Sequence, residues 1–355
     1  MEIKTIYTTT PKVKPTDETA LGFGQTFTDH MFQMDYTPEN GWHNARIVPY
    51  GPLLLDPAST SLHYAQLIFE GMKAYQSADG RILMFRPWEN MKRINRSGER
   101  LCIPPAPEEE LLNGIVELVK VEKDWIPTAP ETSLYIRPFI VSTDAVLGVS
   151  PSKNYLLTVI LSPVGAYYKG GIKPVKIYVE DEYVRAVRGG TGEAKCAGNY
   201  ASSLRAQVNA VEQGYAQVLW LDGVHRKYIE EVGSMNVFFV IDGVVVTPEL
   251  SGSILPGVTR ESVIQIVRDW GIPVEERAVT IDELAKAYDE GKLTEAFGTG
   301  TAAVISPIGE LKWGDKHMEI GGGEIGKLSQ RLYDEISGIR TGAVEDTRNW
   351  IYTAQ

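Results

Sequence analysis

A single lysine lies between two glycine clusters in RGGTGEAKCAGNYASSL, residues 188–204. The amine of a lysine can attack a carbonyl carbon and form a Schiff base, although a lysine in a loop is more often a solvated charge. Gly189, Gly190 and Gly192 allow the backbone before Lys195 to approach another group closely. A helix is predicted to start at Asn199, and its apolar positions at helical spacing are Ala201, Leu204, Val208 and Val211.

Two further segments could bind a phosphate group. Arg93, Arg96 and Arg100 form a basic stripe on one predicted helix, which is either a solvated face or a source of a bidentate phosphate contact. The second segment is LPGVTRES, residues 255–262, where Pro-Gly precedes a helix whose first N–H groups have no intrahelical partner. Thr259 adds a hydroxyl there.

A lysine nucleophile together with a separate phosphate site is what a pyridoxal phosphate enzyme requires. The pyridine nitrogen of that cofactor also needs a carboxylate partner, which keeps it protonated. YIEEVGSMNVFF, residues 228–239, offers Glu230 and Glu231 immediately before an apolar strand. Spacing alone does not choose between these two glutamates or exclude a merely solvated pair.

Other motifs are less informative. GTGTAA, residues 298–303, matches a dinucleotide-binding fingerprint, but the following residues favour a strand where that fingerprint opens a helix. A tight turn or an anion-binding backbone nest is the better interpretation. GGTGEAKC lacks the Gly-Lys-Ser/Thr order of a P-loop, and the five scattered histidines form no metal-binding pattern. We expect no metal site.

Composition narrows the class of protein. The net charge is −11, which argues against nucleic acid or an anionic membrane as the main partner. The N-terminus shows no apolar signal segment, and no apolar run is long enough to span a membrane. Two distant cysteines, Cys102 and Cys196, fit a reducing cytosol. We therefore expect a cytoplasmic protein.

The elements that must position these residues form two blocks of mixed strands and helices. In the first block, RILMF is a predicted strand, Pro87 opens a helix, and a second helix covers 108–125. SPVGAYYKGGIKP, residues 162–174, breaks the periodicity with three glycines and two prolines, and is the candidate interdomain linker. In the second block, a hairpin turns at Asp242-Gly243, TIDE caps a helix, and a last helix covers about 326–339. The expected fold class is a two-domain α/β (α+β) chain.

Several segments in one order resemble the branched-chain aminotransferases of pyridoxal-phosphate fold type IV. The resemblance covers most of the chain, from FGQTFTDHMF to the C-terminal helix. The most specific segments are LHYAQLIFEGMKAY, FRPWENMKRI, SLYIRPFI, PVGAYY, KCAGNYASSL, EEVGSMNVF, ILPGVTRES and FGTGTAAV. The resemblance implies a small N-terminal α/β domain and a large cofactor-binding domain with a pseudo-barrel of strands. With the interdomain linker placed at 165–174, we expect these domains at 1–164 and 175–355.

The same resemblance implies a role for each site residue. Lys195 would be the catalytic residue and would hold pyridoxal 5′-phosphate as an internal aldimine. Tyr200 would bond the ring hydroxyl and Glu231 the pyridine nitrogen, and Ser234 would face the cofactor. The phosphate would be bound by Arg93, Val258, Thr259 and Thr301.

The substrate would lie among Phe23, Tyr64, Phe69, Tyr135, Arg137, Tyr167, Thr301 and Ala302. The implied reaction transfers the amino group of leucine, isoleucine or valine to 2-oxoglutarate, and gives the 2-oxo acid and L-glutamate. The implied active site lies between the two domains and is completed by the partner subunit of a homodimer. The redox-sensitive C-x-x-C of mammalian relatives is replaced here by Ala303 and Ser306, so we do not expect thiol regulation.

Four alternatives remain. D-amino acid aminotransferase and aminodeoxychorismate lyase share the lysine, the glutamate and the phosphate site, but not these aromatic segments. A nicotinamide dehydrogenase using GTGTAA and a non-catalytic binding protein belong to other classes.

Overall fold

The computed structural model describes residues 1–166 and 172–354. Contacts divide the chain into two compact units. The N-terminal unit comprises Met1–Tyr167, Ala194–Ala197 and Gly338–Gln355, and the C-terminal unit comprises Tyr168–Glu193 and Gly198–Ser337. The boundary between the two units falls within the predicted linker 165–174. Residues 167–171 of this linker lie outside the described residues. The N-terminal unit also takes in 194–197 and 338–355, which a single boundary at the linker does not foresee.

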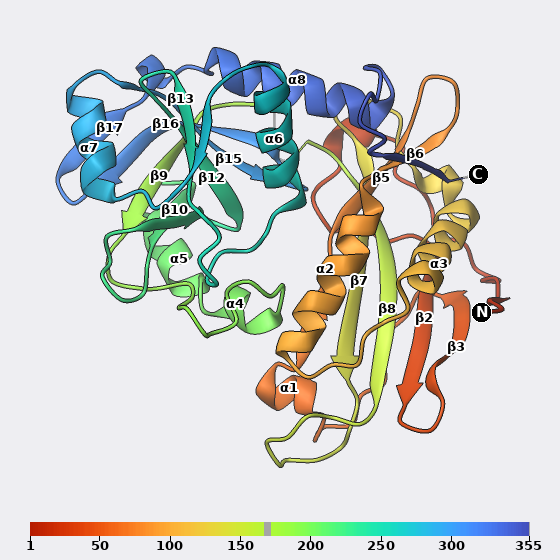
Figure 1. The fold of residues 1–355 in the computed structure, drawn as a ribbon. Helices are drawn as coiled ribbons and strands as arrows, with labels where there is room; N and C mark the ends of the chain where they lie inside the picture. Colours follow the sequence, from red (N-terminus) through yellow and green to blue (C-terminus); the bar gives the residue numbers. More distant parts are fainter. Residues whose placement is uncertain (167–171, 355) are drawn as a thin grey trace. The chain divides into compact units, whose positions relative to one another are not determined.

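The N-terminal unit is a largely antiparallel sheet with two long helices packed on it (Figure 1). Along the sheet the strand order is β1-β3-β2-β8-β7-β5-β6-β18, and β4 pairs with β7. The strands are β1 (Lys4–Thr5), β2 (His30–Thr37), β3 (Gly41–Pro49), β4 (Leu67–Phe69), β5 (Met72–Gln76), β6 (Ile82–Phe85), β7 (Ser133–Ser142), β8 (Tyr155–Val164) and β18 (Ile351–Ala354). The α-helices are α1 (Thr60–Tyr64), α2 (Pro87–Arg100) and α3 (Glu108–Val121), and 3-10 turns cover Glu18–Ala20 and Lys123–Trp125.

The predicted start of α2 is confirmed, because the helix begins at Pro87. Proline is favoured at that position, since its missing N–H would have had no helical partner. Met91 and Ile94 of α2 are completely buried in the core that α2, α3 and the sheet share. Burial of two such side chains contributes roughly 3–6 kcal/mol, which fixes this helix against the sheet.

The C-terminal unit contains a closed ring of strands (Figure 1). Six strands follow the order β11-β10-β9-β16-β15-β12, and pairing of β11 with β12 closes the ring. The strands of this unit are β9 (Val175–Glu180), β10 (Gln217–Leu221), β11 (Ile229–Val232), β12 (Met235–Ile241), β13 (Val244–Thr247), β14 (Val274–Glu276), β15 (Leu293–Gly300), β16 (Val304–Trp313) and β17 (Lys316–Glu319). The ring confirms the predicted pseudo-barrel of strands and, with the two units, the fold class.

The remaining helices are α4 (Ala197–Ala201), α5 (Leu204–Glu212), α6 (Val258–Asp269), α7 (Ile281–Asp289) and α8 (Lys327–Thr341), with a 3-10 turn at Gly321–Gly323. The prediction of one helix starting at Asn199 is wrong. A short α4 begins earlier, and α5 buries Ala206 and Ala210 against β9 and β10. Leu204, Val208 and Val211 are exposed, because the small alanines are the side chains that fit against the sheet.

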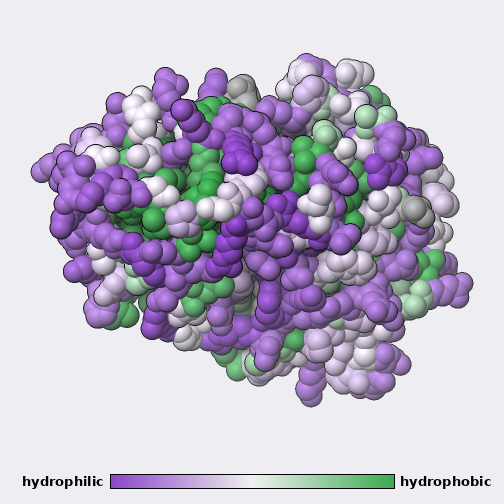
Figure 2. All heavy atoms as spheres, turned by 45° about the horizontal axis from the view of Figure 1, so that its top comes forward, coloured by the Kyte–Doolittle hydropathy of each residue, from purple (hydrophilic) through white to green (hydrophobic). Residues whose placement is uncertain are grey.

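Polar side chains cover most of the face drawn in Figure 2, with hydrophobic residues gathered in smaller patches between them. None of the helices in the described ranges is both long and apolar enough to cross a bilayer.

Candidate functional site

Lys195 is held by its backbone on both sides. Its N–H donates to the Ser97 hydroxyl of α2 at 2.9 Å, and its carbonyl accepts from the N–H of Phe69 in β4 at 3.0 Å. The Lys195 Nζ lies 4.8 Å from the centre of the Phe69 ring, which is a cation–π distance. The lysine is therefore placed by a helix and a strand of the N-terminal unit.

The glycines before the lysine serve the packing of the C-terminal unit. Gly189 has φ +75°, a conformation that favours glycine. A Cβ on Gly192 would collide with the Ser253 carbonyl oxygen, so only glycine lets these two loops touch. This close approach agrees with the role predicted for the cluster, and identifies the approached group as backbone.

Each residue of Phe69-Glu70-Gly71 makes a separate contact. The ring of Phe69 contacts Lys195, and the Glu70 carboxylate is completely buried and binds Asn90 and Arg93. A Cβ on Gly71 would collide with the Tyr135 hydroxyl, so glycine there leaves room for that group. This tripeptide thus contacts Lys195 through Phe69, Arg93 through Glu70 and Tyr135 through Gly71.

Arg93 differs from the other two arginines of its stripe. It is 4% exposed, whereas Arg96 and Arg100 are exposed. Its Nε and Nη2 donate to the two oxygens of Glu70 at 2.6 and 2.9 Å. Burial acts to raise the pKa of Glu70, but Arg93, then Lys195 and Asn90, bring it below its usual range. A buried, oriented guanidinium excludes the solvated-face interpretation for Arg93.

Tyr135 and Arg137 lie on the same face of β7, as the alternation of a strand predicts. Arg137 donates from Nη2 to the Tyr135 hydroxyl at 2.9 Å, and its guanidinium lies 4.7 Å from the Phe69 ring centre. The edge of the Phe23 ring contacts Tyr135 at a centroid distance of 4.9 Å. The structure therefore brings four predicted substrate residues together near Lys195, and the buried Arg137 Nε has no hydrogen-bond partner among the described residues.

One predicted substrate residue of the N-terminal unit, Tyr64, makes its contacts elsewhere. Tyr64 ends α1, is 43% exposed, and donates its hydroxyl to the Leu147 carbonyl at 2.5 Å. Tyr167 lies outside the described residues.

Glu231 is held in the C-terminal unit by groups that the sequence did not indicate. Its Oε1 accepts from the Leu255 N–H at 2.8 Å, and Arg185 Nε lies 3.3 Å from Oε2. Arg185 is itself buried and donates to the carbonyls of Ser253 and Gly192. The neighbouring Glu230 binds the Ser253 hydroxyl instead, so the two adjacent carboxylates point to different partners.

The start of α6 is fixed on the sheet beside Glu231. Pairing places Asn236 of β12 opposite Glu231, and Asn236 Nδ2 donates to the Leu255 carbonyl at 2.9 Å. A Cβ on Gly257 would collide with Asn236 Oδ1, so a glycine is required there. Gly257 offers no capping side chain, and the Val258 N–H donates to no acceptor within the described ranges.

The other predicted cofactor residues of the C-terminal unit lie in turns or at a helix start. Thr259 is buried in the first turn of α6, and Ser234 is exposed in the turn between β11 and β12. Tyr200 lies in α4. Thr301 and Ala302 form the turn between β15 and β16, so GTGTAA continues into a strand and not into a helix.

The dinucleotide interpretation of GTGTAA is therefore excluded by its context. One residue of that segment adds a feature that sequence analysis missed. Pairing places Thr299 opposite Asn236, and the buried Thr299 Oγ1 has no hydrogen-bond partner in the described part of the chain.

Sequence analysis also missed Ser97, Glu70 and Arg185, which hold Lys195, Arg93 and Glu231. Glu70 stands beside Phe69 and could have been suspected from its place in a mainly apolar strand segment. Ser97 and Arg185 have no such signal, since each is far in sequence from the residue that it holds.

Comparison with known proteins gives one consistent answer. The model of the class IV aminotransferase family matches residues 67–311. The branched-chain-amino-acid aminotransferase 2 of Bacillus subtilis is 59% identical, over 98% of this chain and 96% of the relative. The probable branched-chain-amino-acid aminotransferase of Staphylococcus aureus is 57% identical, over 96% of this chain and 95% of the relative.

A solved structure agrees. The branched-chain aminotransferase of the thermophilic archaeon Thermoproteus uzoniensis, with norvaline, has a TM-score of 0.77 at 28% identity and covers 92% of this chain and 100% of that chain. Because the family model matches well over half of the chain and close relatives match nearly all of it, the expected resemblance is confirmed. The chain belongs to the class IV aminotransferases, in the group of the branched-chain-amino-acid aminotransferases.

Proposed function

We propose that this chain transfers the amino group of leucine, isoleucine or valine to 2-oxoglutarate, with pyridoxal 5′-phosphate as cofactor. The products are the branched-chain 2-oxo acid and L-glutamate. The observation that best supports this proposal is the position of Lys195. Ser97 and Phe69 hydrogen-bond its backbone, and its amine lies beside the Phe69 ring, which Arg137 also contacts. Two relatives at 57–59% identity are named branched-chain-amino-acid aminotransferase or transaminase, which supports the amino-donor class.

The residues present fit the cofactor. The start of α6 offers the uncapped Val258 N–H, and a helix N-terminus of this kind favours a phosphate. Glu231 is a buried carboxylate that an N–H and a guanidinium hold in place, as a partner of a protonated ring nitrogen must be. Lys195 supplies the amine that the aldehyde requires.

Each remaining cofactor residue has a proposed contact. Arg93, Thr259 and Thr301 bind the phosphate together with Val258. Tyr200 binds the ring hydroxyl, and the hydroxyl of Ser234 faces the cofactor. When bound, pyridoxal phosphate supplies an aldehyde and a ring that withdraws electrons from the substrate α-carbon.

The chain's own residues then transfer the substrate α-proton and bind the substrate α-carboxylate. Lys195 Nζ would take up the α-proton of the amino acid and deliver it to carbon C4′ of the bound cofactor, acting as general base and then as general acid. Ser97 and Phe69 fix the lysine backbone, so that only the side chain moves between these tasks. The Thr301-Ala302 backbone holds the α-carboxylate.

The aromatic cluster sets the substrate class. Phe23, Phe69 and Tyr135 present apolar surface, and each buried methyl group of a branched side chain contributes roughly 1 kcal/mol. Tyr64 and Tyr167 complete the wall in the proposed complex. Glutamate must enter the same place, and its γ-carboxylate needs a polar partner. Arg137 is that partner, because its Nε retains a hydrogen-bond donor.

The assembly, cellular location and domain boundaries follow the family. We propose a cytoplasmic homodimer whose domains are 1–164 and 175–355, joined by 165–174. Leu62, Tyr64 and Leu147 are exposed apolar side chains of the N-terminal unit, and a partner subunit that covered them would remove apolar surface from water.

The decisive experiment follows the cofactor absorbance in single half-reactions with a panel of L- and D-amino acids. L-leucine, L-isoleucine, L-valine and L-glutamate should each convert the cofactor to its amine form. Conversion by D-amino acids in place of the L-forms, or a colourless protein that binds NADH, would refute the proposal.

A further inference from the structure

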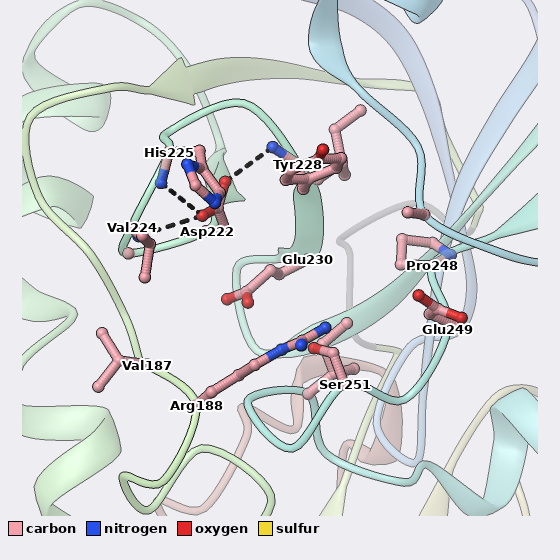
Figure 3. Close-up of a pocket in the computed structure, with 14 residues that line it drawn as sticks. Val187, Arg188, Asp222, Val224, His225, Tyr228, Glu230, Pro248, Glu249 and Ser251 are labelled. Atoms are coloured by element: carbon pink, nitrogen blue, oxygen red, sulfur yellow. Dashed lines mark hydrogen bonds between the residues drawn. The ribbon is translucent and has the colours of Figure 1, made fainter.

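A cavity in the C-terminal unit takes no part in the proposed reaction. It has a volume of about 380 Å³, which is at the small end of the range for ligand sites. Three segments and Ala278 line it; the segments are residues 187–188 after β9, the 222–230 segment between β10 and β11, and the 248–254 loop after β13 (Figure 3). None of its lining residues is among those proposed to bind cofactor or substrate.

The floor of this cavity holds a carboxylate with an unused oxygen. Glu230 is 5% exposed, and its Oε1 accepts from the Ser253 hydroxyl. Its buried Oε2 has no hydrogen-bond partner in the described part of the chain. Figure 3 shows the carboxylate pointing into the cavity. An unpaired buried carboxylate oxygen costs free energy, and a hydrogen-bonding cation would remove that cost.

Of the other two acids that line the cavity, Glu249 is exposed and Asp222 is bound by the fold. Asp222 accepts from the backbone N–H groups of Val224, His225, Lys227 and Tyr228, which closes the turn. Figure 3 draws the bonds from Val224, His225 and Tyr228. The Asp222 oxygens are therefore occupied by the fold. Glu230 differs because Ser253 holds its Oε1, whereas its Oε2 has no hydrogen-bond partner among the described residues.

The rim and walls supply the complementary chemistry. Arg188 lines the cavity, is exposed, and forms no ion pair with any described residue. Figure 3 shows it reaching along one side of the cavity toward Ser251. Val187, Val224 and Ile254 add aliphatic surface. The site thus combines a buried anion, an exposed cation at the rim, and apolar walls.

We propose that this cavity binds a small zwitterionic α-amino acid with a short aliphatic side chain. Its ammonium group donates to Glu230 Oε2, its carboxylate binds Arg188, and its side chain contacts the aliphatic wall. Burial, despite Ser253 and Arg185, raises the pKa of Glu230, and a bound ammonium group would offset that burial. Because Ser253 also holds Arg185, which contacts Glu231, the floor of the cavity is rigidly supported.

The test is isothermal titration calorimetry on the holoenzyme with α-methylleucine, which has no α-proton and cannot be transaminated. Binding at the cavity should weaken about tenfold in Glu230→Gln, because a charge-assisted hydrogen bond is lost. Arg188→Ala should weaken it less, since that side chain is exposed. Val187→Trp fills the cavity from a position that is 41% exposed, so it should abolish binding without touching Glu230.

Two simpler probes separate the contacts. 3-Methylbutylamine should bind with the same dependence on Glu230 but none on Arg188, and 4-methylpentanoate should not bind in the cavity. Lys195→Ala is the control for binding at the proposed catalytic site, and cavity binding should survive in it. If Lys195→Ala abolishes all α-methylleucine binding while Glu230→Gln and Val187→Trp leave it intact, the cavity proposal is wrong and the proposed function still stands.

Discussion

At the scale of single residues, the charged groups of the candidate site are each held by a second residue. Arg93 is paired with Glu70, Glu231 with Arg185, and the Lys195 backbone with Ser97. A group that is fixed before substrate arrives loses little freedom on binding, so such pairs favour catalysis through preorganisation.

Lys195→Ala should abolish transamination and leave the fold intact. The nucleophile and the proton carrier are lost together, so the rate should fall by several powers of ten, while the contacts of Ser97 and Phe69 are to the retained backbone. The measurements are turnover and circular dichroism. Lys153→Ala, at an exposed position, is the matched control. Near-normal turnover of the Lys195 variant would contradict the assignment.

Arg137→Ala should impair the half-reactions of glutamate and 2-oxoglutarate far more than that of leucine. The γ-carboxylate loses its guanidinium partner, whereas an aliphatic side chain loses only packing. Stopped-flow absorbance of the cofactor measures the two half-reactions separately. Arg205→Ala, an exposed arginine, serves as the control. Equal losses for both substrates would mean that Arg137 supports Tyr135 and Phe69 structurally and does not bind glutamate.

At the scale of elements, α2 shows how one helix separates equivalent side chains. Arg93 faces the core and meets Glu70 of the Phe69-Glu70-Gly71 segment, while Arg96 and Arg100 face outward. In the turn between β10 and β11, the Asp222 carboxylate accepts hydrogen bonds from four backbone N–H groups and so fixes the turn.

Arg93→Ala should weaken cofactor retention more than Arg96→Ala or Arg100→Ala. The variant also leaves the buried Glu70 carboxylate without its main partner, which is destabilising in itself. The double variant Glu70→Gln/Arg93→Ala removes the unpaired buried charge. Its cofactor affinity therefore reports the loss of Arg93 without that destabilisation. Titration of pyridoxal phosphate into the apo variants gives the affinities. Equal affinities for all arginine variants would exclude a phosphate contact by Arg93.

Asp222→Asn should destabilise the protein at neutral pH and have little effect near pH 2. Burial acts to raise the pKa of Asp222, but its backbone N–H partners lower it from 3.8 to about 2. A carboxylate with a lowered folded-state pKa contributes stability above the unfolded value of 3.8, and this contribution disappears as the pH falls toward 2. Urea unfolding of both proteins across this range is the measurement. A difference that is independent of pH would show that the charge of Asp222 is not what stabilises the turn.

At the scale of the whole molecule, the chain builds two compact units from segments that interleave in sequence. Residues 194–197, with Lys195, group with the N-terminal unit, and β18 near the end of the chain pairs with β6. The chain carries a net charge of −11, and polar residues cover most of the face drawn in Figure 2.

Removal of the cofactor should lower the melting temperature, and added pyridoxal phosphate should restore it. A ligand that binds only the folded state stabilises that state by mass action. Differential scanning calorimetry of holo, apo and reconstituted protein is the measurement, and inorganic phosphate is the control ligand. In Lys195→Ala the restored shift should be smaller, since the covalent link is absent. Identical melting of holo and apo protein would contradict specific binding.

The sequence by itself determined the features that depend on neighbouring residues. The start of α2 at Pro87, the hairpin turn at Asp242-Gly243 and the Thr280 cap on the Glu283 N–H all occur where local patterns predict them. These features depend on backbone conformations and hydrogen bonds within a few residues, so they can be inferred from a short stretch of sequence. The family could also be inferred, because several specific segments occur in a fixed order.

Tertiary structure alone decided which side chains meet. The buried face of α5 is formed by Ala206 and Ala210, although Leu204 is more hydrophobic, because the fit against the sheet selects the small side chains. Ser97 and Arg185 hold Lys195 and Glu231 from positions 98 and 46 residues away in sequence. Such contacts depend on how strands and helices pack, which no local pattern specifies.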